Sequence, residues 1–180
     1  MKAPIAEEIF TVSGARSFER LALEIFSFQA AGCPVYREYL GLLGVDPGRD
    51  DSLFSIPFMP ISFFRVHTLL TVEGPAARVF LSSGTTGVRQ SRHHLKDPAI
   101  YDRSLEEGFR LFYGDPSEYF IAAILPSYTE RRDSSLVYMM DHLIRESRYD
   151  ASGFYSNDIT DLLLKIDSAK SNRQKIFLMG

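Results

Sequence analysis

The sequence predicts an α/β fold in which an N-terminal helical hairpin packs on a mainly parallel sheet. Helical hydrophobic spacing dominates the first fifty residues, and short apolar strands alternate with amphipathic helices after residue 78. Residues 119–125 are apolar throughout, as a strand covered on both faces would be. We expect a helical segment at residues 1–50 and the start of an α/β domain at residues 51–180.

The composition is that of an ordinary globular domain. Of the 180 residues, 45% are hydrophobic and 24% charged, which excludes whole-chain disorder, collagen and coiled coil. The formal net charge of −3 gives no general electrostatic reason to bind nucleic acid or an anionic membrane. The single cysteine, Cys33, excludes a disulfide framework and a multi-cysteine zinc site, and it fits a reduced, cytoplasmic setting.

Two helices are predicted in the first fifty residues. Ser17 is the candidate N-cap of the first, and apolar residues follow it at helical spacing until Gly32 ends the helix. Pro34 begins the second, which Gly44 ends because glycine readily takes the left-handed conformation that closes a helix. We interpret Cys33, between the two helices, as a packing residue.

A proline-rich segment at residues 56–64 comes next. Its prolines exclude an interior helix, and its aromatic residues form either core or the lining of an acyl channel. Two strands are expected after it, at residues 69–72 and 78–81, joined by a turn. Residues 82–94 are expected to be a polar loop.

Strands and helices alternate in the rest of the chain. Asp97 with Pro98, Ser134 and Asp158 each mark the start of a helix, and further strands are expected at residues 119–125 and 176–179. The last strand ends almost at the final residue, so we expect the natural protein to be longer. Neither a secretory signal nor an apolar stretch long enough to span a membrane is recognisable.

A glycine- and hydroxyl-rich loop follows the strand predicted at residues 78–81. The loop consists of Ser82, Ser83, Gly84, Thr85, Thr86 and Gly87. Its glycines let the backbone approach a ligand closely, and its hydroxyl and N–H groups suit phosphate oxygens. All charged residues between positions 78 and 96 are basic, including Arg89 and Arg92 just after the loop. We expect Arg89, Arg92 and Lys96 to form a positive patch near the loop. We therefore predict an anionic ligand; the alternative is a flexible loop without one.

Three other known motifs built on glycine or serine do not match this loop. The ATPase phosphate loop requires a lysine directly after its last glycine, where this chain has Val88. The GXXG loop of KH domains joins two helices, whereas a strand is expected before residue 82. A serine hydrolase built on Ser83 lacks the G-x-S-x-G turn.

The loop resembles the phosphate loop of adenylate-forming enzymes, although residues 88–92 depart from their usual Pro-Lys continuation. Residues 17–40 and 56–70 are similar to the acyl-protein synthetases of bacterial bioluminescence operons, whose members are about twice as long. The resemblance therefore implies the N-terminal half of such an enzyme. In that family, a fatty or other carboxylic acid reacts with ATP, accompanied by Mg²⁺, to form an acyl-adenylate.

The resemblance also implies partners and site residues. The acyl group passes from the adenylate to a thiol, which implies an acyl-accepting or acyl-reducing protein; coenzyme A is the alternative acceptor. Residues 82–87, Arg89 and Arg92 would hold the phosphates of ATP. Tyr128 is a candidate acyl-pocket residue because an aromatic residue or histidine follows a Leu-Pro step in adenylate-forming enzymes; the alternative is an ordinary charged loop.

Several assignments stay open on the sequence alone. His93 and His94 are either bases or a solvated pair, and the other two histidines are interpreted as structural. No catalytic residue and no metal ligand is assigned, and no carboxylate is an obvious ligand for Mg²⁺. A non-catalytic nucleotide-binding or scaffolding protein is the alternative to an enzyme.

Overall fold

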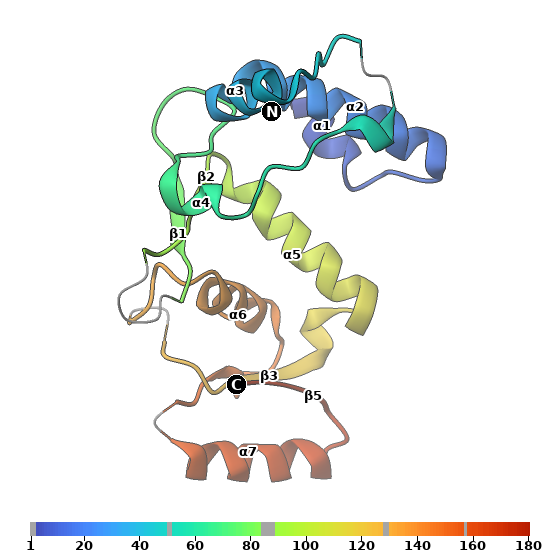
Figure 1. The fold of residues 1–180 in the computed structure, drawn as a ribbon. Helices are drawn as coiled ribbons and strands as arrows, with labels where there is room; N and C mark the ends of the chain where they lie inside the picture. Colours follow the sequence, from blue (N-terminus) through green and yellow to red (C-terminus); the bar gives the residue numbers. More distant parts are fainter. Residues whose placement is uncertain (1–2, 50–51, 84–88, 128–129, 157) are drawn as a thin grey trace. The chain divides into compact units, whose positions relative to one another are not determined.

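The computed structural model describes residues 3–49, 52–83, 89–127, 130–156 and 158–180 (Figure 1). The chain divides into two compact units, Met1–Ile100 and Tyr101–Gly180. The division falls in the first turn of the helix Pro98–Tyr113. The boundary predicted after residue 50 lies inside the first unit and stays a prediction.

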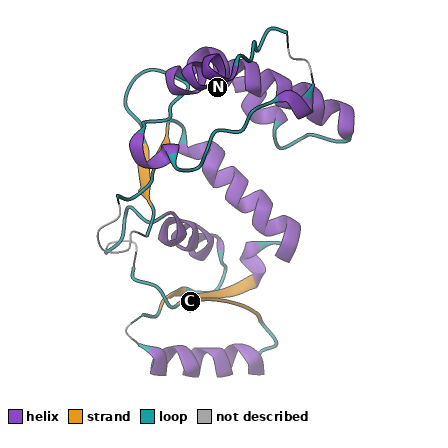
Figure 2. Cartoon of the chain, viewed as in Figure 1, coloured by secondary structure: helices purple, strands orange, loops and turns teal. Residues whose placement is uncertain are grey.

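The first unit is mainly helical and contains one two-stranded antiparallel sheet (Figure 2). Its elements are α1 (Ala3–Glu8), α2 (Ala15–Gly32), α3 (Pro34–Leu43), the short 3-10 helix η1 (Leu53–Ser55), α4 (Phe63–Val66), β1 (Arg78–Leu81) and β2 (Arg92–Leu95). The predicted helical hairpin is present as α2 and α3. The proline-rich segment has no regular structure until α4 begins after its last proline.

The ends of the hairpin helices agree with the sequence except at the start of α2. Pro34 is the first residue of α3, and Gly44 closes it in the left-handed conformation with φ of 70°. The N-cap of α2 is Gly14 and not the predicted Ser17. Ser17 lies in the first turn, where its hydroxyl donates to the carbonyl of Ser13 at 2.6 Å. The prediction was wrong because a serine can bond back to the preceding turn as readily as it caps a helix.

The core of the first unit forms where α2 meets α3. Five side chains are buried there: Phe26, Ala30, Cys33, Tyr36 and Leu40. The Tyr36 hydroxyl donates to the carbonyl of Pro57 at 2.7 Å and so ties the proline-rich segment to this hairpin. Cys33 is only 5% exposed and packs as an apolar residue among these side chains, as the sequence suggested.

The region predicted as strand, turn, strand and loop folds differently. Residues 69–72 form no strand, because this segment packs on α2: a Cβ on Gly32 would lie 2.3 Å from the carbonyl oxygen of Thr71. β1 is present and pairs antiparallel with β2, from Arg78 opposite Leu95 to Leu81 opposite Arg92. Ser82 and Ser83, the described residues of the glycine-rich loop, therefore follow the first strand of a hairpin. We had expected a strand followed by a loop and a helix.

The second unit is an α/β arrangement around a small parallel sheet. Its elements are the greater part of α5 (Pro98–Tyr113), the 3-10 helix η2 (Pro116–Glu118), β3 (Tyr119–Ala123), α6 (Ser135–Glu146), β4 (Gly153–Phe154), α7 (Ile159–Ser171) and β5 (Lys175–Met179). The strand order is β4-β3-β5, and β3 pairs parallel with both neighbours. Ser134 and Asp158 are the N-caps of α6 and α7, as predicted. The two-residue strand β4 was not predicted.

Both faces of β3 are covered, which confirms the interpretation of its apolar sequence. Ile121 and Ala123 pack in a cluster with residues of α5 and α6. Phe120 and Ala122 pack on the other face with residues of α7. Figure 1 shows α6 and α7 on opposite sides of this sheet. The alternation of side chains along a strand places successive residues in these two different clusters.

Candidate functional site

The first unit contains an apolar cavity of about 480 Å³, a volume within the range of small-molecule sites. It is bounded by α2, by the proline-rich segment and by β2. Apolar wall residues include Phe18, Ala22, Ile25, Ile56, Met59 and Leu69. No Asp, Glu, Lys or Arg side chain belongs to the described lining. The cavity therefore suits an apolar ligand.

The proline-rich segment supplies one wall of this cavity. Ile56 and Met59 line the cavity and also pack against the core of the unit. Phe58 lines it too, yet it is 88% exposed, and Ile61 nearby is 80% exposed. The interpretation of this segment as core therefore holds for part of it, and other residues of it line the cavity. The acyl-channel alternative stays a prediction.

Two histidines from β2 are the polar groups of most interest in the wall. His94 Nδ1 is buried and has no hydrogen-bond partner in the described structure. A buried polar atom without a partner costs about 1–3 kcal/mol, so this nitrogen, on a residue of the cavity wall, is a candidate to bond a ligand or water. His93 packs edge-on against Phe64, with ring centroids 5.8 Å apart. Burial, and then the neighbouring His94, lower the pKa of His93 below its ordinary value of 6.5.

The described flanks of the glycine-rich loop close the hairpin. The N–H of Ser82 donates to the carbonyl of Ser91 at 3.0 Å, and the Ser82 hydroxyl accepts from the N–H of Ser91 at 3.0 Å. The side-chain amide of Gln90 adds a bond to the Ser82 carbonyl at 2.9 Å. The hydroxyl of Ser82, predicted to face phosphate, thus already accepts a backbone hydrogen bond.

The other predicted phosphate-binding residues divide into two groups. Ser83, Arg89 and Arg92 are exposed at the turn end of the hairpin. Gly84, Thr85, Thr86 and Gly87 lie outside the described residues, and so does Tyr128. The structure therefore leaves the predicted roles of these five residues as predictions.

Lys96 does not join Arg89 and Arg92 at the loop, contrary to expectation. Its ammonium group donates to the carbonyls of Glu73 and Pro75, at 2.7 and 3.1 Å. It follows the last residue of β2, so it lies about 13 Å along the strand from Arg92 at 3.3 Å per residue. The lysine holds the turn before β1 in place and is not available to a ligand at the loop.

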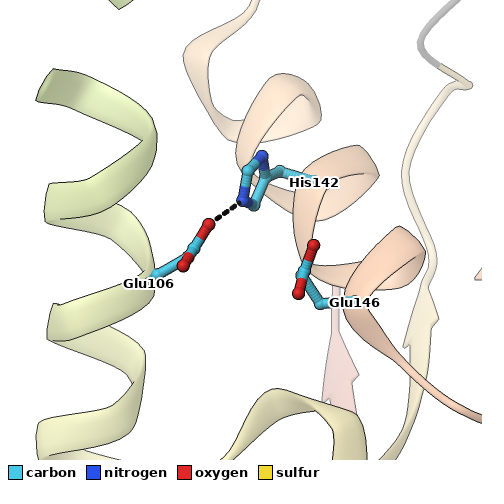
Figure 3. A group of neighbouring side chains, drawn as sticks. All are labelled: Glu106, His142 and Glu146. Atoms are coloured by element: carbon cyan, nitrogen blue, oxygen red, sulfur yellow. Dashed lines mark hydrogen bonds and ion pairs between the residues drawn. The ribbon is translucent and has the colours of Figure 1, made fainter. Parts of the chain in front are cut away.

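A second group of polar side chains lies in the second unit and was not predicted. Glu106 of α5, His142 of α6 and Glu146 of α6 bring their ligand atoms within 4.8 Å of one another (Figure 3). Glu106 Oε1 lies 2.8 Å from His142 Nε2. The spacing of His142 and Glu146 by four residues was a signal, because it places both on one helix face. Glu106 precedes His142 by 36 residues, so its place beside the histidine could not be predicted from sequence spacing.

Comparison with protein-family models, with curated proteins and with solved structures finds no match for this chain. None of the described helices is long and apolar enough to cross a membrane.

Proposed function

We propose that this chain provides the acid-binding and phosphate-binding parts of an ATP-dependent ligase that activates a fatty or other carboxylic acid as an acyl-adenylate, similar to an acyl-protein synthetase. The observation that carries the proposal is the uncharged apolar cavity with the unpartnered His94 Nδ1 in its wall. A carboxylic acid with an apolar tail would fill the cavity, and its head group would supply the missing hydrogen-bond partner.

One hairpin carries both halves of the proposed site. Arg89 and Arg92 are exposed near its turn, and His94 follows two residues after Arg92 on the same strand. A nucleotide held by the loop and an acid held at the histidines would thus contact neighbouring parts of β2. Holding two reactants in a fixed mutual orientation is a main source of rate enhancement in such reactions.

The residues have distinct parts in the proposed reaction. An oxygen of the acid's carboxylate attacks the α-phosphorus of ATP, and pyrophosphate leaves with its electron pair. Charge grows on the departing phosphates, where the guanidinium groups of Arg89 and Arg92 would stabilise it. Mg²⁺ would neutralise phosphate charge when bound, but residues 78–96 contain no carboxylate to ligate it. Its protein ligands would therefore come from outside this segment.

In the proposed reaction the acyl acceptor is a thiol, and the single thiol of this chain, Cys33, is buried. Cys33 contributes to the lining, but it is buried among Phe26, Tyr36 and Leu40 and forms part of their packing. We therefore assign it no role in acyl transfer. The acceptor would be a cysteine of another part of the protein, a partner protein or coenzyme A.

Isothermal titration calorimetry with dodecanoate tests the acid-binding half of the proposal. We expect His94→Ala to weaken dodecanoate binding about ten- to a hundredfold, the value of one lost hydrogen bond to a charged group. Binding of dodecanol, which has the same tail and no charge, should change less. His67→Ala is the matched control, because His67 is exposed and is not among the lining residues. Equal affinities in the His94→Ala and wild-type chains would contradict the proposal.

A second titration, with ATP and Mg²⁺, tests the phosphate-binding half. Replacing Arg89 and Arg92 together by Ala should weaken ATP binding at least tenfold and leave dodecanoate binding unchanged. Arg16→Ala removes an exposed arginine on α2 and should have no effect. ATP binding without any acid binding would favour the non-catalytic nucleotide-binding alternative, and unchanged ATP binding in the double variant would refute the role of the arginines.

A further inference from the structure

We propose that Glu106, His142 and Glu146 form a binding site for a divalent transition-metal ion, with Zn²⁺ as the reference ion, that links α5 to α6 in the second unit. This site is separate from the cavity and the loop of the proposed ligase function, and it does not depend on that function. The trio offers one imidazole nitrogen and two carboxylate oxygens from two different helices.

The positions of the three donors are close to those of a bound ion. Zinc is bound at about 2.0–2.2 Å from nitrogen and oxygen ligands, so neighbouring ligand atoms lie roughly 3–3.5 Å apart. The donors here lie within 4.8 Å of one another, and the Glu106 and His142 donors are 2.8 Å apart. Glu146 is exposed at the end of α6, so its side chain can move the remaining distance by changing rotamer.

Neighbouring contacts hold two of the donors in place. Arg110 Nη1 contacts the other oxygen of Glu106, Oε2, at 3.3 Å, which leaves Oε1 directed at His142 (Figure 3). One turn before His142, the Tyr138 hydroxyl donates to Asp102 at 2.6 Å and ties α6 to α5. The side chains of His142 and Glu106 are only 22% and 26% exposed. Ion binding would therefore cost little reorganisation at these two residues.

The donor set favours a transition metal over calcium or magnesium. Ca²⁺ and Mg²⁺ prefer sites made of oxygen ligands alone, whereas imidazole nitrogen suits Zn²⁺ and its neighbours in the first transition series. Three protein ligands leave a fourth position of a tetrahedral ion for water. On binding, the proton that Nε2 donates to Glu106 leaves for solvent, the Nε2 lone pair goes to the ion, and the neutral ring carries its one proton on Nδ1.

An ordinary hydrogen-bonded ion pair is the competing interpretation of the same geometry. A protonated His142 would form a salt bridge with Glu106 without any ion. The two interpretations differ in one respect: an ion needs the carboxylate of Glu146, whereas the ion pair does not. Replacing Glu146 therefore separates them.

Zinc binding is measured by titration calorimetry, by the midpoint of thermal unfolding and by NMR of the histidine side chains. We expect one site, a midpoint that rises with Zn²⁺ concentration because the ion binds only the folded chain, and a shift of the His142 ring resonances. Glu106→Gln and Glu146→Gln should each weaken binding at least tenfold. Glu107→Gln is the matched control, since Glu107 also pairs with Arg110, at 3.8 Å, but is outside the trio.

Other outcomes would overturn the assignment. Zinc affinity that is equal in the Glu146→Gln and wild-type chains would leave only the ion pair. A shift of the other histidines with His142 unchanged would place the ion elsewhere. An equal rise of the unfolding midpoint with Mg²⁺ would show a general charge effect on an acidic surface. Should Glu106→Gln fail to fold, the exposed Glu146 still provides the decisive variant.

Discussion

The strand β3 in the second unit and residues 54–61 in the first unit differ in how completely they bury their apolar side chains. In the second unit, four residues of the sheet and α6 are 0% exposed: Ile121, Ala122, Ala123 and Met140. In the first unit, η1 and the proline-rich segment after it leave Phe54 98% and Phe58 88% exposed. Both units have other exposed apolar residues, and the second unit also has an apolar cavity, of about 420 Å³, beside α5, α6 and β5. Within the described residues, the first unit differs in adding a buried histidine nitrogen without a hydrogen-bond partner to its cavity wall. Close packing maximises stability, whereas incomplete packing leaves room for a ligand.

Truncating one apolar residue in each unit tests this contrast most strongly. Ile121→Ala removes a fully buried side chain from the centre of β3 and should lower the free energy of unfolding by about 2–5 kcal/mol. Phe58→Ala removes a larger but exposed side chain and should change it by less than about 0.5 kcal/mol. Urea unfolding followed by circular dichroism measures both. Similar costs would show that the cavity wall is packed as tightly as the sheet.

A series of hydrogen bonds through two serine hydroxyls in the second unit provides the test with the next largest expected effect on stability. The N–H of Ile121 donates to Ser152, Ser152 donates to Ser147, and Ser147 donates to the carbonyl of Tyr119, at 3.0, 2.7 and 2.6 Å. These bonds extend the short pairing of β3 with β4, which covers only two residues of each strand.

Ser152→Ala would leave the N–H of Ile121 without its partner. Because this N–H belongs to a fully buried residue, we expect a loss of about 1–3 kcal/mol and faster hydrogen exchange at Ile121. Ser168→Ala, on α7 and outside this series of hydrogen bonds, is the comparison variant. Unchanged exchange at Ile121 would mean that water replaces the hydroxyl and that the serines do not hold the sheet.

The elements that the sequence predicts differ from those that it misses in whether their signal lies in neighbouring residues. Helices α3, α6 and α7 carry local signals at their starts, in Pro34, Ser134 and Asp158, and all three begin where predicted. β2 has the sequence Arg-His-His-Leu, which lacks alternating apolar residues, and only its pairing with β1 makes it a strand. Local chemistry therefore predicts these three helix starts, whereas β2, which depends on its partner strand, is missed.

The candidate sites follow the same rule. The glycine-rich loop was recognised as a contiguous motif, although four of its residues lie outside the described structure. The cavity and the trio of Glu106, His142 and Glu146 require tertiary contacts between separate elements. The sequence placed His142 and Glu146 on one helix face but contained no sign that α5 would bring Glu106 to them.

Helix caps provide a smaller test of local signals in the two units. The Asp158 carboxylate accepts from the N–H of Asp161 at 2.9 Å, so Asp158→Ala should destabilise the chain by about 1 kcal/mol. Ser17 is not the cap of α2, so Ser17→Ala should cost only a few tenths of a kcal/mol. Chemical unfolding measures both variants. A larger loss at Ser17 would show that its bonds to Ser13 and Gly14 anchor the helix after all.

The smallest expected effect is a pH dependence of stability that arises at the cavity wall. The pKa of His93 is lowered by burial and then by His94, so in the folded chain it lies below the ordinary value of 6.5, which the unfolded chain keeps. Between these two values the unfolded state binds more protons than the folded state. Stability from this residue is therefore complete above pH 6.5 and decreases as the pH falls below it.

His93→Gln removes this contribution, so the free energy of unfolding should depend less on pH between pH 5 and 7 than in the wild-type chain. The difference should be modest, because His93 keeps part of its surface exposed. His67→Gln, which replaces an exposed histidine outside the cavity lining, should leave the slope as it is. Dodecanoate sharpens the test: a carboxylate bound beside His93 favours the protonated ring, so saturating acid should reduce the loss of stability below pH 6.5. If dodecanoate left the slope unchanged while still binding, its head group would lie away from the histidines, and the first unit's cavity would bind the acid in the opposite orientation.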